Sequence, residues 1–279
     1  MAAARYTRAT LVRELGFVAV AAIFCVPFYL LVAIALETTA QADTTPLAFP
    51  RPPHFGNFST AWRTGGQFGL GHALQSSLII TVSSVAGLIV LGSLCAYTIA
   101  RRRSRLSDVV YILFVLAIIL PFQLAIIPLF VELRHLGLVG NYAGMILLNI
   151  GLLMPLTVFL YTGFIRALPR DYEEAARVDG ARLLRTYARI VFPLLRPITG
   201  TAAVLLAVIV WNEFFVALIF LAGSRYQTLP VALYTFAGDY TARWNLVFAG
   251  VAIAIAPLLG FFVFAQRELI RGFTAGVKG

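Results

Sequence analysis

Long stretches of this 279-residue chain contain no charged residue, and charged residues make up only 12% of it. A soluble domain carries about 25% charged residues. A disordered chain needs low hydrophobicity, whereas 60% of these residues are hydrophobic. A helix of roughly 20 apolar residues crosses the hydrocarbon core of a bilayer. The sequence therefore predicts an integral membrane protein.

Six apolar runs are long enough to be membrane-spanning helices. The first follows a basic start, but it is longer than the roughly 7–15 residues of a signal-peptide core, so we expect a retained helix. We expect an all-α polytopic protein that forms a single transmembrane domain over residues 1–279. An irregular outer loop, 37–72, would hold one short element around Phe58–Trp62. The expected spans are residues 15–36, 74–100, 109–132, 142–166, 198–222 and 246–267.

The basic residues are unevenly distributed between the two sides of these spans. One side holds 17 of the 22 arginines and lysines, and the other holds 5. Loops rich in Arg and Lys stay in the cytoplasm. We therefore expect a multi-pass protein of the cell membrane with both termini cytoplasmic. Because topology accounts for the net charge of +10, nucleic-acid binding is not expected. The arginine-rich segments are 1–14, 101–108, 166–197 and 267–279.

The sequence lacks the residue patterns of catalysis and of metal binding. A phosphate-binding loop of the GxxxxGK[ST] type needs a lysine before Ser or Thr, and the only lysine, Lys278, precedes Gly279. The three histidines lie in outer segments, and Cys25 and Cys95 lie in apolar runs without metal-ligand spacing. We expect no catalytic residue, no metal site and no cofactor in this chain.

The segment 167–197 is the longest expected cytoplasmic connection. Pro169 disfavours continuation of the fourth span, and Asp171 with Glu174 resembles a capping box that opens a new helix. Gly180 permits a turn, and a second helix would run over about 182–191 until Pro193 and Pro197 end it. This helix pair either lies passively on the membrane surface or docks into a groove on a cytoplasmic partner.

The spacing within this segment resembles that of a known loop. Glu174-Ala175-Ala176 is followed after three residues by Gly180, and after nine more by Ile190-Val191-Phe192-Pro193. This pattern resembles the EAA loop of ABC importer permeases, with Phe192 where that family usually has Leu. The segments WNEFF at 211–215, TLP at 228–230 and the tail 271–279 resemble carbohydrate-uptake permeases of the maltose-permease G-subunit type.

The resemblance implies the permease subunit of an ATP-driven importer that moves a sugar or oligosaccharide inward. It implies a heterodimer with a second, related permease. It further implies two ATPase subunits that bind ATP and Mg, and an extracytoplasmic sugar-binding protein. The residues that it assigns to coupling with the ATPase are Glu173, Glu174, Ala175, Ala176, Arg177, Asp179, Gly180, Ile190 and Pro193.

Polar residues within the spans are candidates for the substrate path. Glu213 is ionisable and lies inside a span, so it either lines the path or bonds to a neighbouring helix through Asn149 or Gln123. The path candidates are Gln123, Asn149, Trp211, Asn212 and Glu213.

The last outer loop, 223–245, is expected to contact the binding protein, and an ordinary aromatic belt is the alternative. The candidates for this contact are Tyr234, Asp239 and Tyr240.

Two other functions are compatible with parts of the pattern. The solute could be another small polar molecule, such as glycerol phosphate. A stand-alone channel or secondary transporter would need no EAA loop and usually has more charged residues in its spans. A membrane-embedded enzyme is disfavoured by the missing catalytic residues.

Overall fold

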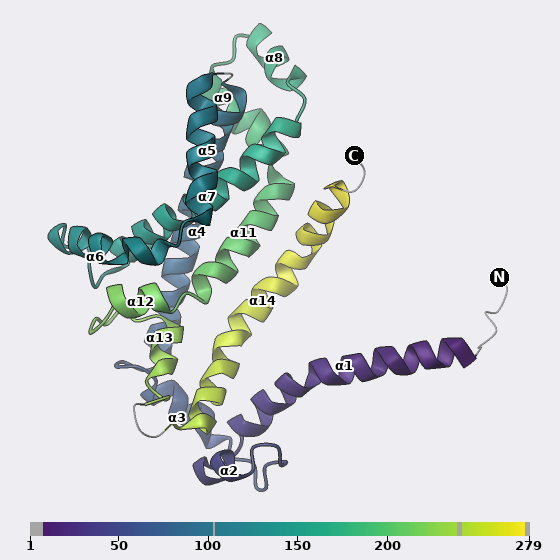
Figure 1. The fold of residues 1–279 in the computed structure, drawn as a ribbon, viewed down its shortest axis with the longest axis vertical. Coiled ribbons are helices and arrows are strands. Elements are labelled where there is room, and N and C mark those ends of the chain that lie inside the picture. Colours follow the sequence, from purple (N-terminus) through teal and green to yellow (C-terminus); the bar gives the residue numbers. More distant parts are fainter. Residues whose placement is uncertain (1–7, 103, 239–241, 277–279) are drawn as a thin grey trace. The chain divides into compact units, whose positions relative to one another are not determined.

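The computed structural model describes residues 8–102, 104–238 and 242–276, and the regular secondary structure of this part is entirely helical (Figure 1). The expected all-α fold class is confirmed. Asp239 and Tyr240, two of the expected contacts of a binding protein, lie outside the described residues. The chain divides into two compact units, residues 1–70 with 232–256 (unit 1) and residues 71–231 with 257–279 (unit 2).

Unit 1 consists of α1 (Arg8–Ala35), α2 (Thr39–Thr44), α3 (Gly56–Thr64) and the first part of α14 (Trp244–Gly276). The helix α3 confirms the short element expected around residues 58–62. Asn57 joins these parts, because its Nδ2 donates to the carbonyls of Ala35 at 2.9 Å and Glu37 at 2.7 Å. Its Oδ1 accepts from Asn245 of α14 at 3.2 Å. One amide thus connects the end of α1 to α3 and α14.

Unit 2 contains the remaining helices, and α4, α13 and α14 continue across the division between the units. Its helices are α4 (Leu70–Arg101), α5 (Arg105–Ile119), the 3₁₀ helix η1 (Phe122–Ala125), α6 (Ile126–His135), α7 (Tyr142–Ala167), α8 (Asp171–Val178), α9 (Leu183–Thr186), the π-helix η2 (Tyr187–Val191), α10 (Phe192–Leu194), α11 (Arg196–Trp211), α12 (Phe215–Phe220) and α13 (Leu229–Tyr234).

Three helices are long and apolar enough to cross a membrane singly, among the residues that the structure describes. They cover residues 10–35, 70–101 and 142–167 and correspond to the expected spans 15–36, 74–100 and 142–166. Two bent helix pairs have the composition of further spans, and a shorter apolar helix covers residues 244–260. The number of six spans stays a prediction.

The expected span 109–132 is not one helix. It consists of α5 and α6 with η1 between them, and the two halves are bent by 95°. Pro121 favours the break, because a residue that precedes proline disfavours the helical backbone. Leu120 is accordingly extended, with φ −70° and ψ 130°. Beyond the break α6 packs on α12, where the rings of Phe130 and Phe220 lie 5.5 Å apart.

The expected span 198–222 is also interrupted. The helix α11 ends at Trp211 and α12 begins at Phe215, although the residues between them belong to a largely apolar run. The side chain of Asn212 turns back and donates to the carbonyl of Val208 at 2.8 Å. Glu213 follows at the break itself, where its carboxylate meets free backbone N–H groups of the next helix.

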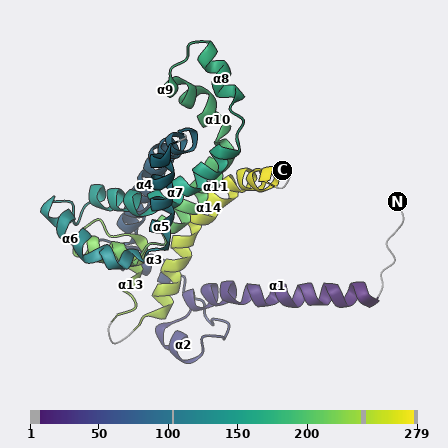
Figure 2. The ribbon, with the colours of Figure 1, turned by 45° about the horizontal axis from the view of Figure 1, so that its top comes forward.

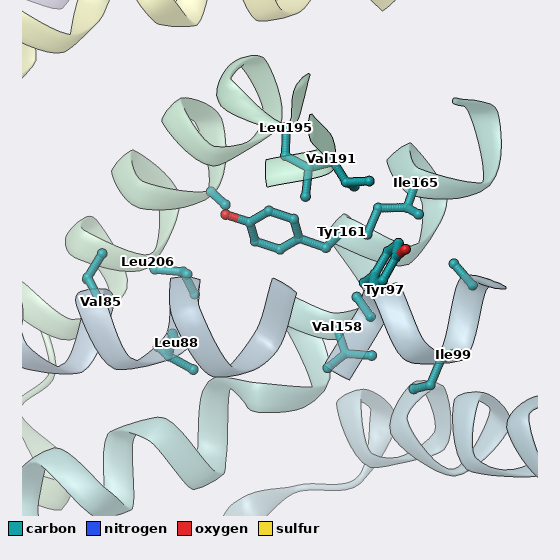
Figure 3. Close-up of a cluster of buried hydrophobic side chains, with 13 residues drawn as sticks. Val85, Leu88, Tyr97, Ile99, Val158, Tyr161, Ile165, Val191, Leu195 and Leu206 are labelled. Carbon is teal, nitrogen blue, oxygen red and sulfur yellow. The ribbon is translucent and has the colours of Figure 1, made fainter. Parts of the chain in front are cut away.

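The main core of unit 2 lies between α4, α7 and α11 (Figure 3). Tyr161 of α7 is its largest fully buried side chain, and its hydroxyl donates to Thr199 of α11 at 3.0 Å. Leu88 of α4 and Leu206 of α11 pack into the same cluster. In a membrane, where apolar burial adds little, such close packing and interhelical hydrogen bonds hold helices together.

Gly92 provides the test of this close packing. A methyl group at Gly92 would collide with Thr157, a fully buried residue of α7 whose β-branched side chain is stiff. We expect Gly92→Ala to lower the stability by about 1–3 kcal/mol, the usual cost of overpacking, measured as a lower Tm of the purified protein. Gly163→Ala on α7 is the matched control, because nothing lies within 4 Å of its new methyl group. Equal Tm values for the two variants would contradict close packing at Gly92.

Candidate functional site

The first helix of the long connection, α8, lies at one extremity of unit 2 together with α9 (Figures 1 and 2). It ends in a Schellman turn, in which the N–H of Ala181 donates to the carbonyl of Ala176 at 2.9 Å. The turn needs a left-handed residue, and Gly180 supplies it with φ +75°. The helix–glycine–helix shape expected from the sequence is therefore present.

The expected capping box at the start of α8 is wrong. The helix begins at Asp171 itself, and no side chain caps it. Arg170 takes the cap position, and its carbonyl accepts from the N–H groups of Glu173 and Glu174 at 2.9 and 3.0 Å. Asp171 and Glu174 instead lie in the first turn, where acidic side chains favour the positive end of a helix.

Glu173 anchors α8 to the end of α4. Its carboxylate accepts from Arg101 Nε at 2.7 Å and from the Tyr97 hydroxyl at 3.0 Å. A second nitrogen of Arg101 donates to the carbonyl of Leu168, where α7 ends, at 3.2 Å. The ion pair is nearly buried, since the Arg101 and Glu173 side chains are 10% and 7% exposed. The Arg101–Glu173 pair thus links the ends of α4 and α7 to α8.

The remaining coupling candidates on α8 and its turn divide between a buried and an exposed side. Ala176 is buried, so its small side chain serves packing within this chain. Val178 follows on the exposed side and is 88% exposed. A helix fixed on one side that presents small and apolar groups on the other is suited to docking. The exposed candidates are Glu174, Ala175, Arg177, Asp179 and Gly180.

The second half of the connection extends further than expected. Helical turns continue past Pro193 to Leu194, and the chain bends by 76° before α11 starts at Arg196. Pro193 lies at the start of α10, directly after the π-helix η2. Ile190 and Pro193 are both half-buried.

Aromatic packing ties this half to α4 as well. The hydroxyl of Tyr187 lies 2.6 Å from Ser93 Oγ, and its ring lies 5.2 Å from that of Tyr97. Phe192 packs against the main core, with its ring 5.9 Å from Tyr187. Phe192, where the EAA loop usually has Leu, thus places an apolar side chain against the core.

Two of the path candidates line one cavity of about 220 Å³ between α5, α7 and the break after α11. Asn149 is 2% exposed, and its Nδ2 has no hydrogen-bond partner among the described residues. Glu213 uses both carboxylate oxygens to accept from the N–H groups of Val216 and Ala217, at 2.9 and 2.8 Å. Of the two alternatives for Glu213, the bond to Asn149 or Gln123 is therefore not formed. The carboxylate satisfies the backbone at the start of α12.

The other path candidates lie elsewhere. Trp211 lines a separate apolar cavity of about 300 Å³ between α4, α11 and residues 257–258. Gln123 and Asn212 are exposed, and Asn212 bonds to its own helix. Tyr234, the described candidate for contact with a binding protein, ends α13 and is 53% exposed. Of the five path candidates, Asn149 and Glu213 thus line the same cavity. The other three do not line it, and they are Gln123, Trp211 and Asn212.

Comparison with known proteins identifies the family. Residues 88–273, more than half of the chain, match the family of binding-protein-dependent transport system inner membrane components. The chain belongs to this family. It is a transport permease subunit and not an enzyme.

Two relatives resemble the permease over most of its length. The melibiose/raffinose/stachyose import permease protein MelC of Bacillus subtilis (strain 168) is 38% identical over 282 residues, covering 100% of both chains. The probable starch degradation products transport system permease protein AmyC of Thermoanaerobacterium thermosulfurigenes is 33% identical over 250 residues, 90% of each chain.

The fold of the permease also matches that of a solved protein. The matched protein is a chain in the crystal structure of a bacterial ABC transporter involved in the import of the acidic polysaccharide alginate. The TM-score is 0.76 at 21% identity, over 95% of this chain and 99% of that chain. This likeness supports the helical fold found here.

Sequence reasoning missed the residues of the permease that hold Glu173. Tyr97 lies near the end of the expected span 74–100 and Arg101 directly follows it, and nothing near them in the sequence points to α8. The available signal was the pair Glu173-Glu174, because two adjacent residues on a short helix cannot both face one partner. The positive-inside count had also put Arg101 on the same side as the loop.

Neighbouring glutamates test the anchor. We expect Glu173→Ala to destabilise the permease by about 3–5 kcal/mol, because Arg101 stays buried without its counter-charge. The control is Glu174→Ala, which removes the same group from an exposed position and leaves stability nearly unchanged. The measurement is thermal unfolding of the purified permease. The anchor is refuted if both variants unfold at the same temperature.

Proposed function

We propose that this permease is the membrane subunit of an ATP-driven importer of a sugar or oligosaccharide, coupled to a separate ATPase through residues 167–197. Its family supports the transport role. The names of two relatives support a carbohydrate substrate, because one refers to the import of melibiose, raffinose and stachyose and the other to starch degradation products.

The observation that carries the coupling role is the two-sided character of α8. Glu173 fixes one side of the helix to α4, so α8 and the end of α4 move together. The opposite side, with Ala175 and Val178, is exposed. A partner that pushes or pulls α8 therefore moves α4, which has the length and composition of a membrane span. This is the mechanical link that an importer with no ATP site of its own requires.

The proposal includes the remaining subunits and the orientation. A second, related permease completes the membrane part, two ATPase subunits bind ATP and Mg, and an extracytoplasmic binding protein delivers the sugar. The arginine count supports the orientation, with the coupling loop and both termini in the cytoplasm. Tyr234, Asp239 and Tyr240 are proposed on the opposite side, toward the binding protein.

A bulky residue at Ala175 tests the coupling role. Ala175→Trp places a large side chain on the exposed side of α8 without touching the Glu173 anchor. We expect the ATPase to co-purify at less than about a tenth of the wild-type amount, and sugar uptake to fall equally, because the docking side no longer fits. Co-purification and uptake of labelled sugar in cells measure the two effects.

Ala188→Trp is the matched control for this experiment. Ala188 is also exposed on the connection, but it is one of the nine spacer positions at which the EAA pattern specifies no residue type, so this variant should retain ATPase and uptake. An unchanged Tm of Ala175→Trp shows that the protein still folds. Normal uptake by Ala175→Trp would refute docking through α8.

We further propose that Asn149 and Glu213 contribute to the substrate path. The Asn149 amide carries an unpaired donor into an otherwise largely apolar cavity, and an unpaired buried donor costs about 1–3 kcal/mol. Sugar hydroxyls accept such hydrogen bonds. The interrupted helices beside the cavity provide two joints, after Leu120 and after Trp211, at which its walls can move.

Removal of the Asn149 amide tests this step. We expect Asn149→Leu to lower the ratio of uptake rate to KM by about tenfold, because a neutral hydrogen bond is worth about 0.5–1.5 kcal/mol. Thr162→Val, which removes another buried and unpaired polar group of α7 outside the cavity, should leave uptake unchanged. Equal uptake kinetics in both variants exclude Asn149 from the path but leave the coupling proposal intact.

A further inference from the structure

A cavity rich in arginine lies where α4, α5 and α7 meet, and the proposed transport function does not use it. Its volume is about 530 Å³, within the roughly 300–1,000 Å³ of small-molecule sites. All its lining residues belong to unit 2. The ionisable side chains that line it are Arg101, Arg102, Arg105, Asp108, Arg166 and Arg170.

Two of the five arginines already have partners. Arg101 is paired with Glu173. The guanidinium of Arg166 lies 3.9 Å from Asp108 and stacks over the ring of Tyr111 at 4.6 Å from its centroid. The Arg101 pair is close and nearly buried, whereas the contact between Arg166 and Asp108 is longer and exposed to solvent.

The other three arginines have no such partner. The side chains of Arg102, Arg105 and Arg170 make no hydrogen bond or ion pair with any residue that the structure describes. The only acid that lines the cavity, Asp108, is already associated with Arg166. Arg102 and Arg105 are exposed and Arg170 is half-buried, so three guanidinium groups without a counter-charge line one cavity that is open to solvent. Like charges that line one cavity favour the binding of an anion.

The chemistry and the position of the cavity indicate which class of anion it binds. The planar guanidinium matches phosphate oxygens with paired N–H donors, and arginine is favoured wherever phosphate is bound. The cavity lies at the end of two helices, α4 and α7, that are long and apolar enough to cross a membrane. Lipid headgroups lie at this depth, and basic pockets between spans bind anionic ones.

We propose that this cavity binds a phosphate-bearing anion, with the chemistry of an anionic phospholipid headgroup, through Arg102, Arg105 and Arg170. The site is separate from the exposed side of α8, and the inference does not depend on ATPase coupling or on a sugar substrate. A bound headgroup would hold the ends of α4, α5 and α7 together beside the anchor of Glu173. Lipid composition would thereby influence the stability of the region that carries the loop.

The test compares two triple variants of the full-length permease with its co-purifying subunits, in a neutral detergent. The cavity variant carries Arg102→Gln, Arg105→Gln and Arg170→Gln. The control carries Arg182→Gln, Arg185→Gln and Arg189→Gln, which remove the same charge from exposed positions that do not line the cavity. Native mass spectrometry measures binding of phosphatidylglycerol and of phosphatidylcholine with the same acyl chains, and isothermal titration calorimetry measures inorganic phosphate.

We expect the cavity variant to bind phosphatidylglycerol at least about tenfold more weakly than the wild type, because each basic residue near a headgroup contributes separately. The control should keep wild-type affinity, and phosphatidylcholine should bind all three proteins equally. If inorganic phosphate displaces phosphatidylglycerol and binds with similar affinity, the natural anion is a soluble phosphate. If inorganic phosphate does not displace phosphatidylglycerol, the natural anion is the lipid. Both results support a phosphate site.

The proposal is overturned if the two triple variants lose phosphatidylglycerol binding equally, since general positive charge would then explain it. It is also overturned if the cavity variant binds as the wild type does. Should the triple variant fail to fold, the single variants Arg105→Gln and Arg170→Gln test the same point, with a graded loss expected. Uptake is not part of the readout, so failure here leaves the transport proposal standing.

Discussion

The buried ion pair between Arg101 and Glu173 is the contact through which the long connection is joined to the rest of its unit. A buried pair is favourable only when further hydrogen bonds satisfy both groups. Tyr97 supplies one to the carboxylate, and the carbonyl of Leu168 accepts one from the guanidinium. Because the four residues come from α4, α7 and α8, none of these helix ends can shift far without exposing a buried charge. The connection is therefore a rigid extension of α4.

Apolar runs predicted where helices lie, but they could not predict which helices are straight. The ends of α4 and α7 fall within a few residues of the expected spans. Pro27 and Pro155 both lie inside unbroken helices, whereas Pro121 follows a break of 95°. The residue type is the same in each case. The outcome differs because α6 gains packing against α12 after the turn, and such tertiary contacts are absent from the sequence pattern.

In the candidate site, too, the sequence pattern predicted local structure but not the contacts between distant residues. A short helix after Pro169 and a turn at Gly180 were correctly predicted, because both are local properties. Which glutamate faces inward depends on Arg101, which is distant in the sequence, so the pattern could not separate Glu173 from Glu174. Likewise an interhelical bond was one of two alternatives for Glu213, but an interrupted helix offers it free N–H groups at closer range. Backbone donors that a break exposes must be satisfied within a membrane.

The arginines illustrate how one sequence signal can combine several physical causes. Their number on one side is accounted for by membrane topology, and a count treats them as equivalent. Their contacts separate them: Arg101 is buried and paired, Arg166 is shared between Asp108 and Tyr111, and Arg170 lines the same cavity without a counter-charge. Topology requires only that these charges stay out of the bilayer, and scattered exposed positions satisfy that requirement at little cost. Their convergence on one cavity is a further feature that topology does not require, and it is this convergence that calls for an anion.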